Sequence, residues 1–190
     1  SISRTFIASY NRVYLNHVAS LSAQNYQVDI DDAAHLFWKE RIQILEPFDV
    51  KGTAFVIERS LAPHENDQVN SYLPTERRVR RLSAKERADS FMGTNFSLDD
   101  VEGFSGRVLD FKWTYLGTKT VLAVVNNHEE AARLHGPNSR VPDARWEVRR
   151  SYVVEIRSNW DAHPVPVKIV FFDEDSWNVN LAMSFDPDDR

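Results

Sequence analysis

Four arginines lie within five positions of the stretch YLPTERRVRRLS, and they are the residues of this sequence best suited to binding a charged group. The guanidinium group binds carboxylates and phosphates through paired N–H groups and stacks on aromatic rings. On a strand, Arg77 and Arg81 share one face with Val79, whereas Arg78 and Arg80 share the other. Charges on both faces do not fit a flat phosphate-binding stripe, so we expect partners on either side of the strand.

Three kinds of partner are open for these arginines. Acidic residues of the same chain, above all Asp99 and Asp100, fit a lid in which at least two of the arginines pin the segment FMGTNFSLDD onto the sheet. Anionic lipid headgroups and a partner protein are the alternatives. Nucleic acid is not expected as a partner, because the net charge is -5 and general nucleic-acid binders are usually basic.

Two acidic clusters could serve an enzyme, but each has a simpler structural explanation. Asp99 and Asp100 could form a general acid–base pair, and the turn Asp173–Ser176 could bind a metal ion. Acids at a helix start and Asp or Ser in a hairpin turn are also ordinary capping residues. The six histidines lack metal-ligand spacing, and the chain has no cysteine. The sequence therefore predicts no catalytic residue, no metal site and no cofactor.

Composition indicates a folded chain with a sizeable core. The 190 residues are 42% hydrophobic and 12% aromatic, and no apolar run is long enough to span a membrane. We expect a single domain over residues 1–190, with residues 1–33 the least defined. The sequence starts at Ser1 without a secretory signal peptide, so a processed form or a C-terminal portion of a longer protein is expected.

The clearest strand lies in VLDFKWTYLGTKTVLAVV, where apolar and polar residues alternate. Gly117–Thr118 predicts a tight turn, after which Val121–Val125 returns as the partner strand. The apolar face of the first strand consists of Leu109, Phe111, Trp113 and Tyr115.

A second hairpin is predicted near the C-terminal end, with Asp173–Ser176 as its turn. Its apolar residues are Val165, Val167, Ile169 and Phe171 on one strand and Val179, Leu181, Met183 and Phe185 on the other. A further strand is predicted in RWEVRRSYVVEIR, with an apolar face that Arg150 interrupts. That face consists of Trp146, Val148, Tyr152, Val154 and Ile156.

The remaining segments predict further strands and a few helices. The stretch RTFIASYNRVYLNHVASL has helix-like spacing, GTAFVIERS and NSYLP read as strands, and Ser97 caps a short helix. A polar loop follows Asn126, with a helical turn at Glu129–Leu134. The count reaches about seven or more antiparallel strands with few helices, which either stack as two sheets or curl into a barrel. The residues with helix-like spacing in the N-terminal stretch are Phe6, Tyr10, Val13 or Tyr14, Val18 and Leu21.

The aromatic strands are compatible with two functions. They can form an ordinary core, or they can line a curved sheet whose concave face is too wide to fill and holds an apolar ligand. Periodicity alone does not separate these two possibilities. For the second, the expected lining residues are Leu109, Phe111, Trp113, Tyr115, Val154, Ile156, Ile169, Phe171, Leu181 and Met183.

Several motifs in the same order carry a family resemblance: YLPTERRVRRLS, DSFMGTNFSLDD, FKWTYLGTK, RWEVRRSYVVEI and KIVFFDEDSWNV. Through them the chain resembles the DUF1329 family of bacterial envelope proteins, and it is also similar to outer-membrane lipoprotein-sorting (LolA/LolB-like) proteins. The resemblance covers about Phe48–Asp186, and it is weakest before Ala34. Family members are usually longer than this chain.

The resemblance implies a mainly β fold: an open, strongly curved antiparallel sheet, or incomplete barrel, with a few helices plugging its concave face. It also implies a periplasmic protein of the bacterial envelope, and it transfers no catalytic residue. The leading hypothesis is a non-enzymatic carrier of a lipid or other hydrophobic ligand, in which Arg77, Arg78, Arg80, Arg81, Asp99 and Asp100 lock the lid or meet a headgroup. A module that docks onto an envelope transporter or outer-membrane protein is the alternative, and a metal-assisted enzyme is the third.

Overall fold

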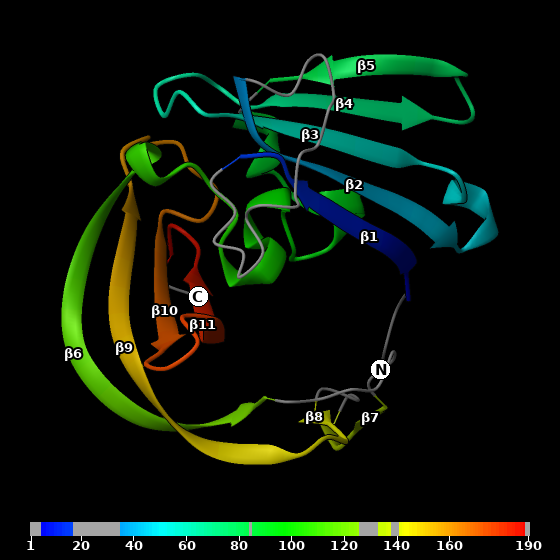
Figure 1. Cartoon of the computed structure of the whole chain (residues 1–190). Coiled ribbons are helices and arrows are strands. Elements are labelled where there is room, and N and C mark those ends of the chain that lie inside the picture. Colours follow the sequence, from blue (N-terminus) through cyan, green and yellow to red (C-terminus); the bar gives the residue numbers. More distant parts are fainter. Residues whose placement is uncertain (1–4, 17–34, 84, 126–132, 138–140, 189–190) are drawn as a thin grey trace, which may run out of the picture. The chain divides into compact units, whose positions relative to one another are not determined.

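The computed structural model describes residues 5–16, 35–83, 85–125, 133–137 and 141–188. The chain forms two compact units, one spanning Ser3–Arg87 and the other Ala88–Arg190. Each unit is built on its own antiparallel sheet (Figure 1). Whether the units act together as the single domain expected from the sequence stays a prediction.

The first unit contains a five-stranded sheet with the order β1-β2-β3-β4-β5. Each strand pairs with the next one along the chain, so the sheet is a meander. The predicted strands in GTAFVIERS and NSYLP are confirmed. The predicted strand in TERRVRR is confirmed from Arg78 onward, whereas Arg77 lies in the preceding turn with a φ of 50° and shares no strand face. The strands are β1 (Ile7–Tyr14), β2 (Leu36–Glu46), β3 (Ala54–Ser60), β4 (Gln68–Leu73) and β5 (Arg78–Leu82).

Alternation along β2 determines which face of this sheet is buried. Leu36, Trp38, Ile42 and Ile44 share one face of the strand, and all four are buried. Glu40 interrupts this apolar row and is also buried. Its carboxylate is compensated by an ion pair with an arginine of β1, as a buried charge requires.

The predicted N-terminal helix is wrong where the structure describes it, because Ile7–Tyr14 forms the strand β1. Tyr10 and Tyr14 are four residues apart, which fits one face of a helix but also one face of a strand. Tyrosine, valine and isoleucine favour the strand, and pairing with β2 decides between the two. Val18 and Leu21, the later positions of the predicted helix, lie outside the described residues.

The second unit contains a four-stranded sheet with the order β11-β10-β9-β6. β6 and β9 are the long strands, and both curve strongly along their length (Figure 1). A separate two-stranded ladder joins β7 and β8. The strands are β6 (Phe111–Val124), β7 (Leu134–His135), β8 (Val141–Pro142), β9 (Trp146–Ser158), β10 (Val167–Asp173) and β11 (Val179–Phe185).

The predicted turn at Gly117–Thr118 is wrong, since β6 runs through it as one strand. The register against β9 shifts between Tyr115 and Gly117, so the extra residue, Leu116, forms a β-bulge. Gly117 has a φ of 116°, which a glycine adopts in a bulge as readily as in a turn. β9 is long enough to pair with both halves of β6, so Val121–Val125 does not return as a separate strand.

The other strand predictions for this sheet are confirmed. β10 and β11 form the predicted hairpin, in which Val167 pairs with Phe185, Ile169 with Met183 and Phe171 with Leu181. β9 follows the predicted alternation of RWEVRRSYVVEIR. The predicted helical turn at Glu129–Leu134 lies mostly outside the described residues, and Leu134 itself begins β7.

The helices that the structure describes are short 3-10 turns. η5 begins after Ser97, as predicted, and the Asp100 carboxylate accepts hydrogen bonds from Ser97 N and Oγ at 2.7 Å each. At the end of η5, Gly103 lies so close to Val179 of β11 that a Cβ there would overlap the valine side chain. The turns are η2 (Phe48–Val50), η3 (Lys85–Arg87), η4 (Phe91–Gly93), η5 (Leu98–Gly103) and η6 (Val108–Asp110).

The fold class predicted from the sequence is confirmed. The described chain is mostly strand, both sheets are antiparallel, and no described strand closes either sheet into a barrel. η5 packs against β11, on the inner side of the curve that β6 and β9 form (Figure 1). The helical elements that plug the concave face are therefore 3-10 turns rather than α-helices.

Candidate ligand-binding face

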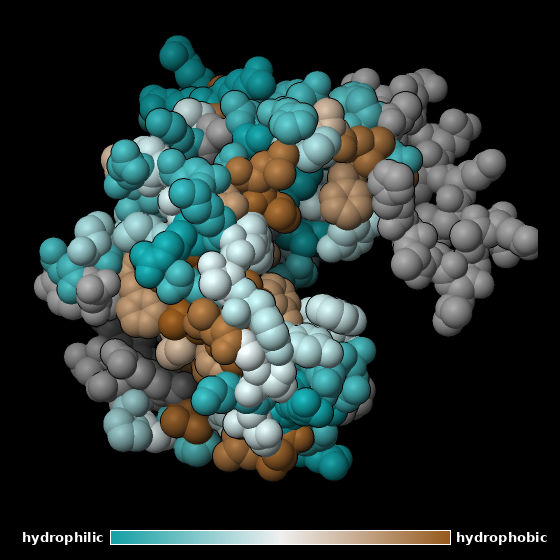
Figure 2. Space-filling view, turned by 90° about the vertical axis from the view of Figure 1, so that its left-hand side faces the viewer, coloured by the Kyte–Doolittle hydropathy of each residue, from teal (hydrophilic) through white to brown (hydrophobic). Residues whose placement is uncertain are grey.

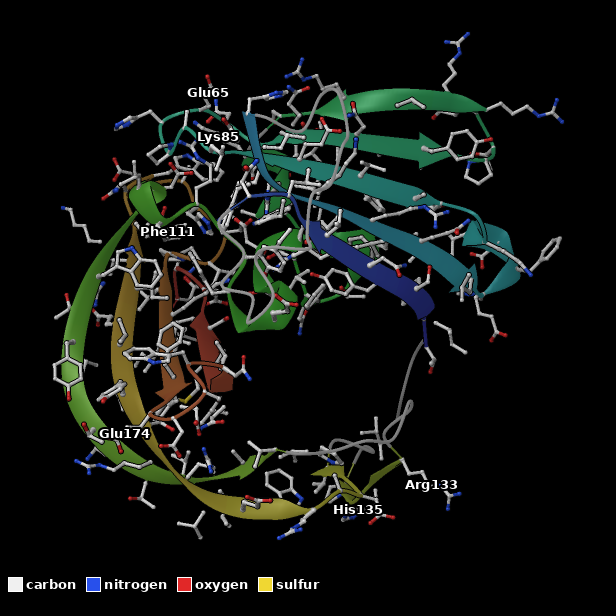
Figure 3. The ribbon with its side chains drawn as sticks, viewed as in Figure 1. Glu65, Lys85, Phe111, Arg133, His135 and Glu174 are labelled. Atoms are coloured by element: carbon white, nitrogen blue, oxygen red, sulfur yellow. The ribbon has the colours of Figure 1, made fainter. Side chains whose placement is uncertain are left out.

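Strand register brings a row of large apolar side chains to one face of the four-stranded sheet. Trp113 of β6 lies opposite Ile156 of β9, and Tyr115 lies opposite Val154. Opposed residues of antiparallel strands project to the same face, which Phe111 at the start of β6 also shares (Figure 3). We call this face of the sheet the aromatic face.

The part of the aromatic face near Phe111, at the start of β6, is packed. Phe111, Ile156 and Val170 form a buried cluster. Phe104, which follows η5, lies edge-on to the rings of Phe111 and Trp113, with centroid distances of 5.2 and 5.0 Å. The segment that contains η5 therefore covers this part of the sheet but does not cover the part nearer the bulge.

The part of the aromatic face nearer the bulge is open to solvent. The exposed fractions are 37% for Trp113, 61% for Tyr115 and 67% for Trp177 of the β10–β11 turn. Tyr152 of β9 connects them, with ring centroids 6.2 Å from Tyr115 and 5.3 Å from Trp177, on which it stacks. Exposed aromatic rings in contact with one another are typical of a surface that binds an apolar molecule.

The ten lining residues expected from the sequence do not share one surface. Five lie on the aromatic face, whereas four lie on the opposite face of the same sheet, because they oppose one another across β10 and β11. Leu109 lies in η6, outside the sheet. The five are Phe111, Trp113, Tyr115, Val154 and Ile156; the four are Ile169, Phe171, Leu181 and Met183.

A buried ion pair borders the packed part of the aromatic face. Lys168 of β10 lies opposite Ile156 of β9, and its Nζ donates to the carboxylate of Asp100. The side chain of Lys168, including its charged ammonium group, is almost fully buried. Burial alone would raise the pKa of Asp100, but the hydrogen bond and charge of Lys168, with the bonds from Ser97, together hold that pKa below its ordinary value.

The four clustered arginines lie in the other unit, with exposed side chains. Arg80 pairs with Glu76 at 2.6 Å. The carboxylate of Asp100 is bound by Lys168 rather than by an arginine of the cluster, and Asp99 is buried. The role of the arginines in locking a lid or binding a headgroup stays a prediction. The other three arginines are Arg77, Arg78 and Arg81.

The turn of the β10–β11 hairpin is organised by Asp173, and its predicted capping role is confirmed. Oδ1 accepts hydrogen bonds from the backbone N–H groups of Asp175 and Ser176. Arg149 of β9 donates to both carboxylate oxygens at 2.7 Å each, and Asn180 donates to Oδ2. The Arg149 bonds, aided by Asn180 and the turn amides, outweigh burial and hold the pKa of Asp173 far below its ordinary value.

Acid should destabilise this unit through Asp100 and Asp173. Both carboxyl pKa values are lower in the folded chain than in the unfolded chain, so the folded state binds fewer protons and stability rises with pH in this range. The stabilisation is complete above the unfolded value of about 4 and is lost as the pH falls below it. Urea midpoints measured between about pH 7 and pH 3 should fall mainly at the acid end; a flat profile would contradict this.

Four residues of the candidate site were not among the lining residues expected from the sequence. Phe104 and Trp177 lie next to turns, where no periodic pattern shows which face a side chain joins. Tyr152 was on the predicted apolar face of its strand, but alternation did not show its contacts with neighbouring rings. Lys168 lies two residues before Val170, on the same face of a strand that is apolar on both faces. Nothing in the sequence therefore indicated that Lys168 is buried.

A cavity of about 740 Å³ lies elsewhere in this unit. It is bounded by the segment that contains η4, by the loop before β10 and by the end of β11. Its lining combines apolar side chains such as Phe96 and Val165 with hydroxyl, amide and carboxylate groups, so it is less apolar than a typical small-molecule site. The polar lining includes Ser90, Thr94, Asn95, Ser97, Asp100, Ser184 and Asp186.

Within the described residues, no three His, Asp or Glu side chains lie close enough together to hold a metal ion. The described helices include none that is long and apolar enough to cross a membrane.

Comparisons with known proteins agree with this fold. A domain described as that of an outer membrane lipoprotein-sorting protein, from Vibrio parahaemolyticus, is 19% identical with a TM-score of 0.54 and covers 80% of this chain. A DUF1329 family protein from Desulfovibrio piger is also 19% identical, with a TM-score of 0.54 over 85% of this chain. A LolA superfamily protein from Nitrosomonas europaea is 12% identical with a TM-score of 0.44 over 80% of this chain.

The chain spans about half the length of these solved structures, namely 52%, 56% and 52% of the three chains. No curated protein matches it. The family model described as "Protein of unknown function (DUF1329)" matches residues 4–190, almost the whole chain. Because this match covers almost the whole chain, the protein belongs to the DUF1329 family.

Proposed function

We propose that this protein binds a lipid or another hydrophobic molecule on its aromatic face and acts as a non-enzymatic carrier in the bacterial cell envelope. The observation that carries the proposal is the exposure of Tyr115 and Trp177, which are joined by ring contacts through Tyr152, together with the partly exposed Trp113 on the same face of the sheet. The fold shared with a lipoprotein-sorting domain supports the same function.

The energetics favour covering this surface. Removing a large apolar side chain from water stabilises the covered state by about 1.5–3 kcal/mol. The hydroxyl group of Tyr115 already bonds to Thr118 and that of Tyr152 to Glu174, so the rings stay available for stacking. A ligand that covers the three rings gains free energy from burying their exposed parts, which offsets part of the cost of association.

Native mass spectrometry of the protein purified without detergent, followed by solvent extraction, tests the proposal. A lipid or other apolar molecule at near-stoichiometric amounts is the expected result, and it would also identify the ligand class. An apo mass together with no uptake of an added fluorescent fatty acid would overturn the proposal and leave the rings without a carrier function.

Trp113→Ala should weaken uptake of the fluorescent fatty acid about tenfold, because a stacking surface worth more than 1 kcal/mol is lost. It should lower the free energy of unfolding less than it lowers binding, since Trp113 is partly exposed. Tyr115→Ser, at a still more exposed ring, should weaken uptake with little loss of stability. Titration by fluorescence and urea denaturation of the same samples measure both quantities.

Leu181→Ala is the matched control for these variants. Leu181 is 43% exposed and lies on the opposite face of the same sheet. If it leaves uptake unchanged while Trp113→Ala weakens it, the ligand lies on the aromatic face. If Leu181→Ala weakens uptake and Trp113→Ala does not, the ligand lies on the face of Ile169 and Met183 instead. If Trp113→Ala only unfolds the protein, Trp113 belongs to the core.

One observation favours the alternative function, a module that docks onto an envelope transporter or outer-membrane protein. Beyond the last pair with β10, β6 and β9 continue as a two-stranded ribbon in which Leu122 lies opposite Val148. These side chains are 64% and 71% exposed, and other apolar side chains reach the molecular surface shown in Figure 2. Leu122→Ser should lower co-purification of a partner protein without changing fatty-acid uptake if this ribbon is a docking site; loss of fatty-acid uptake would instead extend the ligand site to Leu122, which lies on the same face as Tyr115.

A further inference from the structure

The arginine-rich strand β5 is an edge of the five-stranded sheet. Among the described strands it pairs only with β4, through Arg78–Leu82 and Val69–Leu73. All of its residues from Arg78 to Arg81 are exposed. No described strand therefore pairs with the backbone N–H and C=O groups on its outer side, which a further strand can use.

Most of the charge on this edge is uncompensated within the described part of the chain. Arg80 pairs with Glu76 but keeps 60% of its side chain exposed. Arg77, Arg78 and Arg81 form no ion pair with any residue that the structure describes. Arg78 and Arg81 of β5, and Arg77 in the turn before it, thus lack an ion pair among the described residues of a chain whose net charge is -5.

The register shows that these charges project from both faces of the sheet. Arg78 pairs with Leu73 and Arg80 with Ser71, so these two arginines share the face that also carries Ser71. Arg81 pairs with Asn70 and projects to the other face. A flat anionic surface such as a bilayer can approach only one of these faces at a time.

We propose that β5 is a docking edge for an acidic segment of a partner protein, which adds to the sheet as a further strand. Side chains of an added strand also alternate between the two faces, so successive carboxylates can meet Arg78 and Arg80 on one face and Arg81 on the other. Backbone hydrogen bonds supply the pairing, and the guanidinium forks select carboxylates. This partner site is independent of the aromatic face and of its ligand.

Charged residues on an edge strand have a simpler use, which is to prevent association between sheet edges. That role needs positive charge only, so lysine serves as well as arginine. Recognition of carboxylates needs the planar fork, which lysine lacks. The triple variant R78K/R80K/R81K therefore separates the two: it should stay monomeric yet bind an acidic strand several-fold more weakly.

The test uses the whole chain and a short fluorescent peptide in which Glu-Asp-Glu-Asp is flanked by Val and Thr residues. Anisotropy titration should show binding that weakens with salt, and Arg81→Gln should weaken it about threefold to tenfold. Arg41→Gln is the matched control, because Arg41 is exposed on the inner strand β2 and its loss removes the same charge. An equal loss of peptide affinity in Arg81→Gln and in Arg41→Gln would overturn the proposal.

A second peptide with alternate backbone nitrogens methylated has the same charge but cannot complete the ladder. It should bind at least tenfold more weakly than the parent peptide; equal binding would overturn strand addition. If the protein binds vesicles of phosphatidylcholine and phosphatidylglycerol through these arginines but does not bind the peptide, the proposal is overturned in favour of a lipid surface. Failure to bind either probe, with aggregation of the Arg→Gln variants, would overturn it in favour of edge protection.

Discussion

Asp173→Ala should lower the free energy of unfolding by about 3 kcal/mol, because it removes the buried carboxylate that binds Arg149 and leaves the other donors around it unsatisfied. Asp173 is fully buried, and it accepts hydrogen bonds from Arg149, from Asn180 and from the amides of its own turn. These bonds join β9, β10, β11 and the turn that carries Trp177. Urea denaturation followed by tryptophan fluorescence measures the loss, and acyl-ligand uptake should fall with it because the ring stack on Tyr152 depends on this turn.

Asp175→Ala is the control for that variant. Asp175 also accepts a hydrogen bond from Arg149, at 2.9 Å, but its side chain is 80% exposed. An exposed ion pair contributes about 0–1 kcal/mol, so Asp175→Ala should cost much less than Asp173→Ala. Similar losses in the two variants would show that the turn does not depend on the buried carboxylate.

Asp100→Ala should be comparably destabilising, by about 3 kcal/mol or more, because it leaves the ammonium group of Lys168 buried and unpaired. The same change removes the carboxylate that accepts the hydrogen bonds of Ser97 at the start of η5. The segment that covers Phe111 should then detach before the sheet unfolds. Hydrogen exchange of residues around η5, combined with urea denaturation, measures both effects.

The double variant D100A/K168M separates the two causes. Methionine fills the space of the lysine without its charge, so the double variant should recover much of the stability lost in Asp100→Ala. No recovery would mean that the cap on η5, rather than the buried charge, accounts for the loss. Glu102→Ala, a change of acid in the same turn, controls for the loss of negative charge.

A carrier function has a physical basis in how this sheet is covered. η5 and Phe104 bury the part of the aromatic face near Phe111, and the Asp100–Lys168 ion pair holds this cover in place. Trp113 borders this cover through its contact with Phe104, whereas Tyr115 and Trp177 beyond it are mostly exposed among the described residues. Stability and ligand binding therefore rest on different parts of one face, which is why their variants can be told apart.

Alternating patterns were enough to predict most of the second sheet. In β9 and in the β10–β11 hairpin, apolar residues recur at every second position, and both the strands and their shared faces follow from that period. Capping at the start of η5 and at Asp173 was also predictable, since short acidic side chains near a turn accept hydrogen bonds from its free amides: Asp100 from that of Ser97, and Asp173 from that of Ser176. Strand existence and local caps depend on neighbours in sequence, which the sequence contains directly.

Where prediction was wrong, two structures satisfied the same local pattern. Gly117 suits a turn and a bulge equally, and only the length of β9 decides that β6 runs on. The spacing of Tyr10 and Tyr14 suits a helix and a strand, and only the neighbouring β2 decides for the strand. In each case the deciding contact comes from a segment at least 20 residues away in the sequence.

The sequence by itself determined that this protein is a mainly antiparallel β chain of the DUF1329 family, because period-two patterns and ordered motifs are local properties. Only the tertiary structure decided which apolar residues share a surface. β10 is apolar on both sides, so pairing between strands had to separate Ile169 and Phe171 from Trp113 and Tyr115. Burial of Lys168 and Asp173 likewise depends on partners brought in from distant segments, since a charge is buried only where another charge meets it.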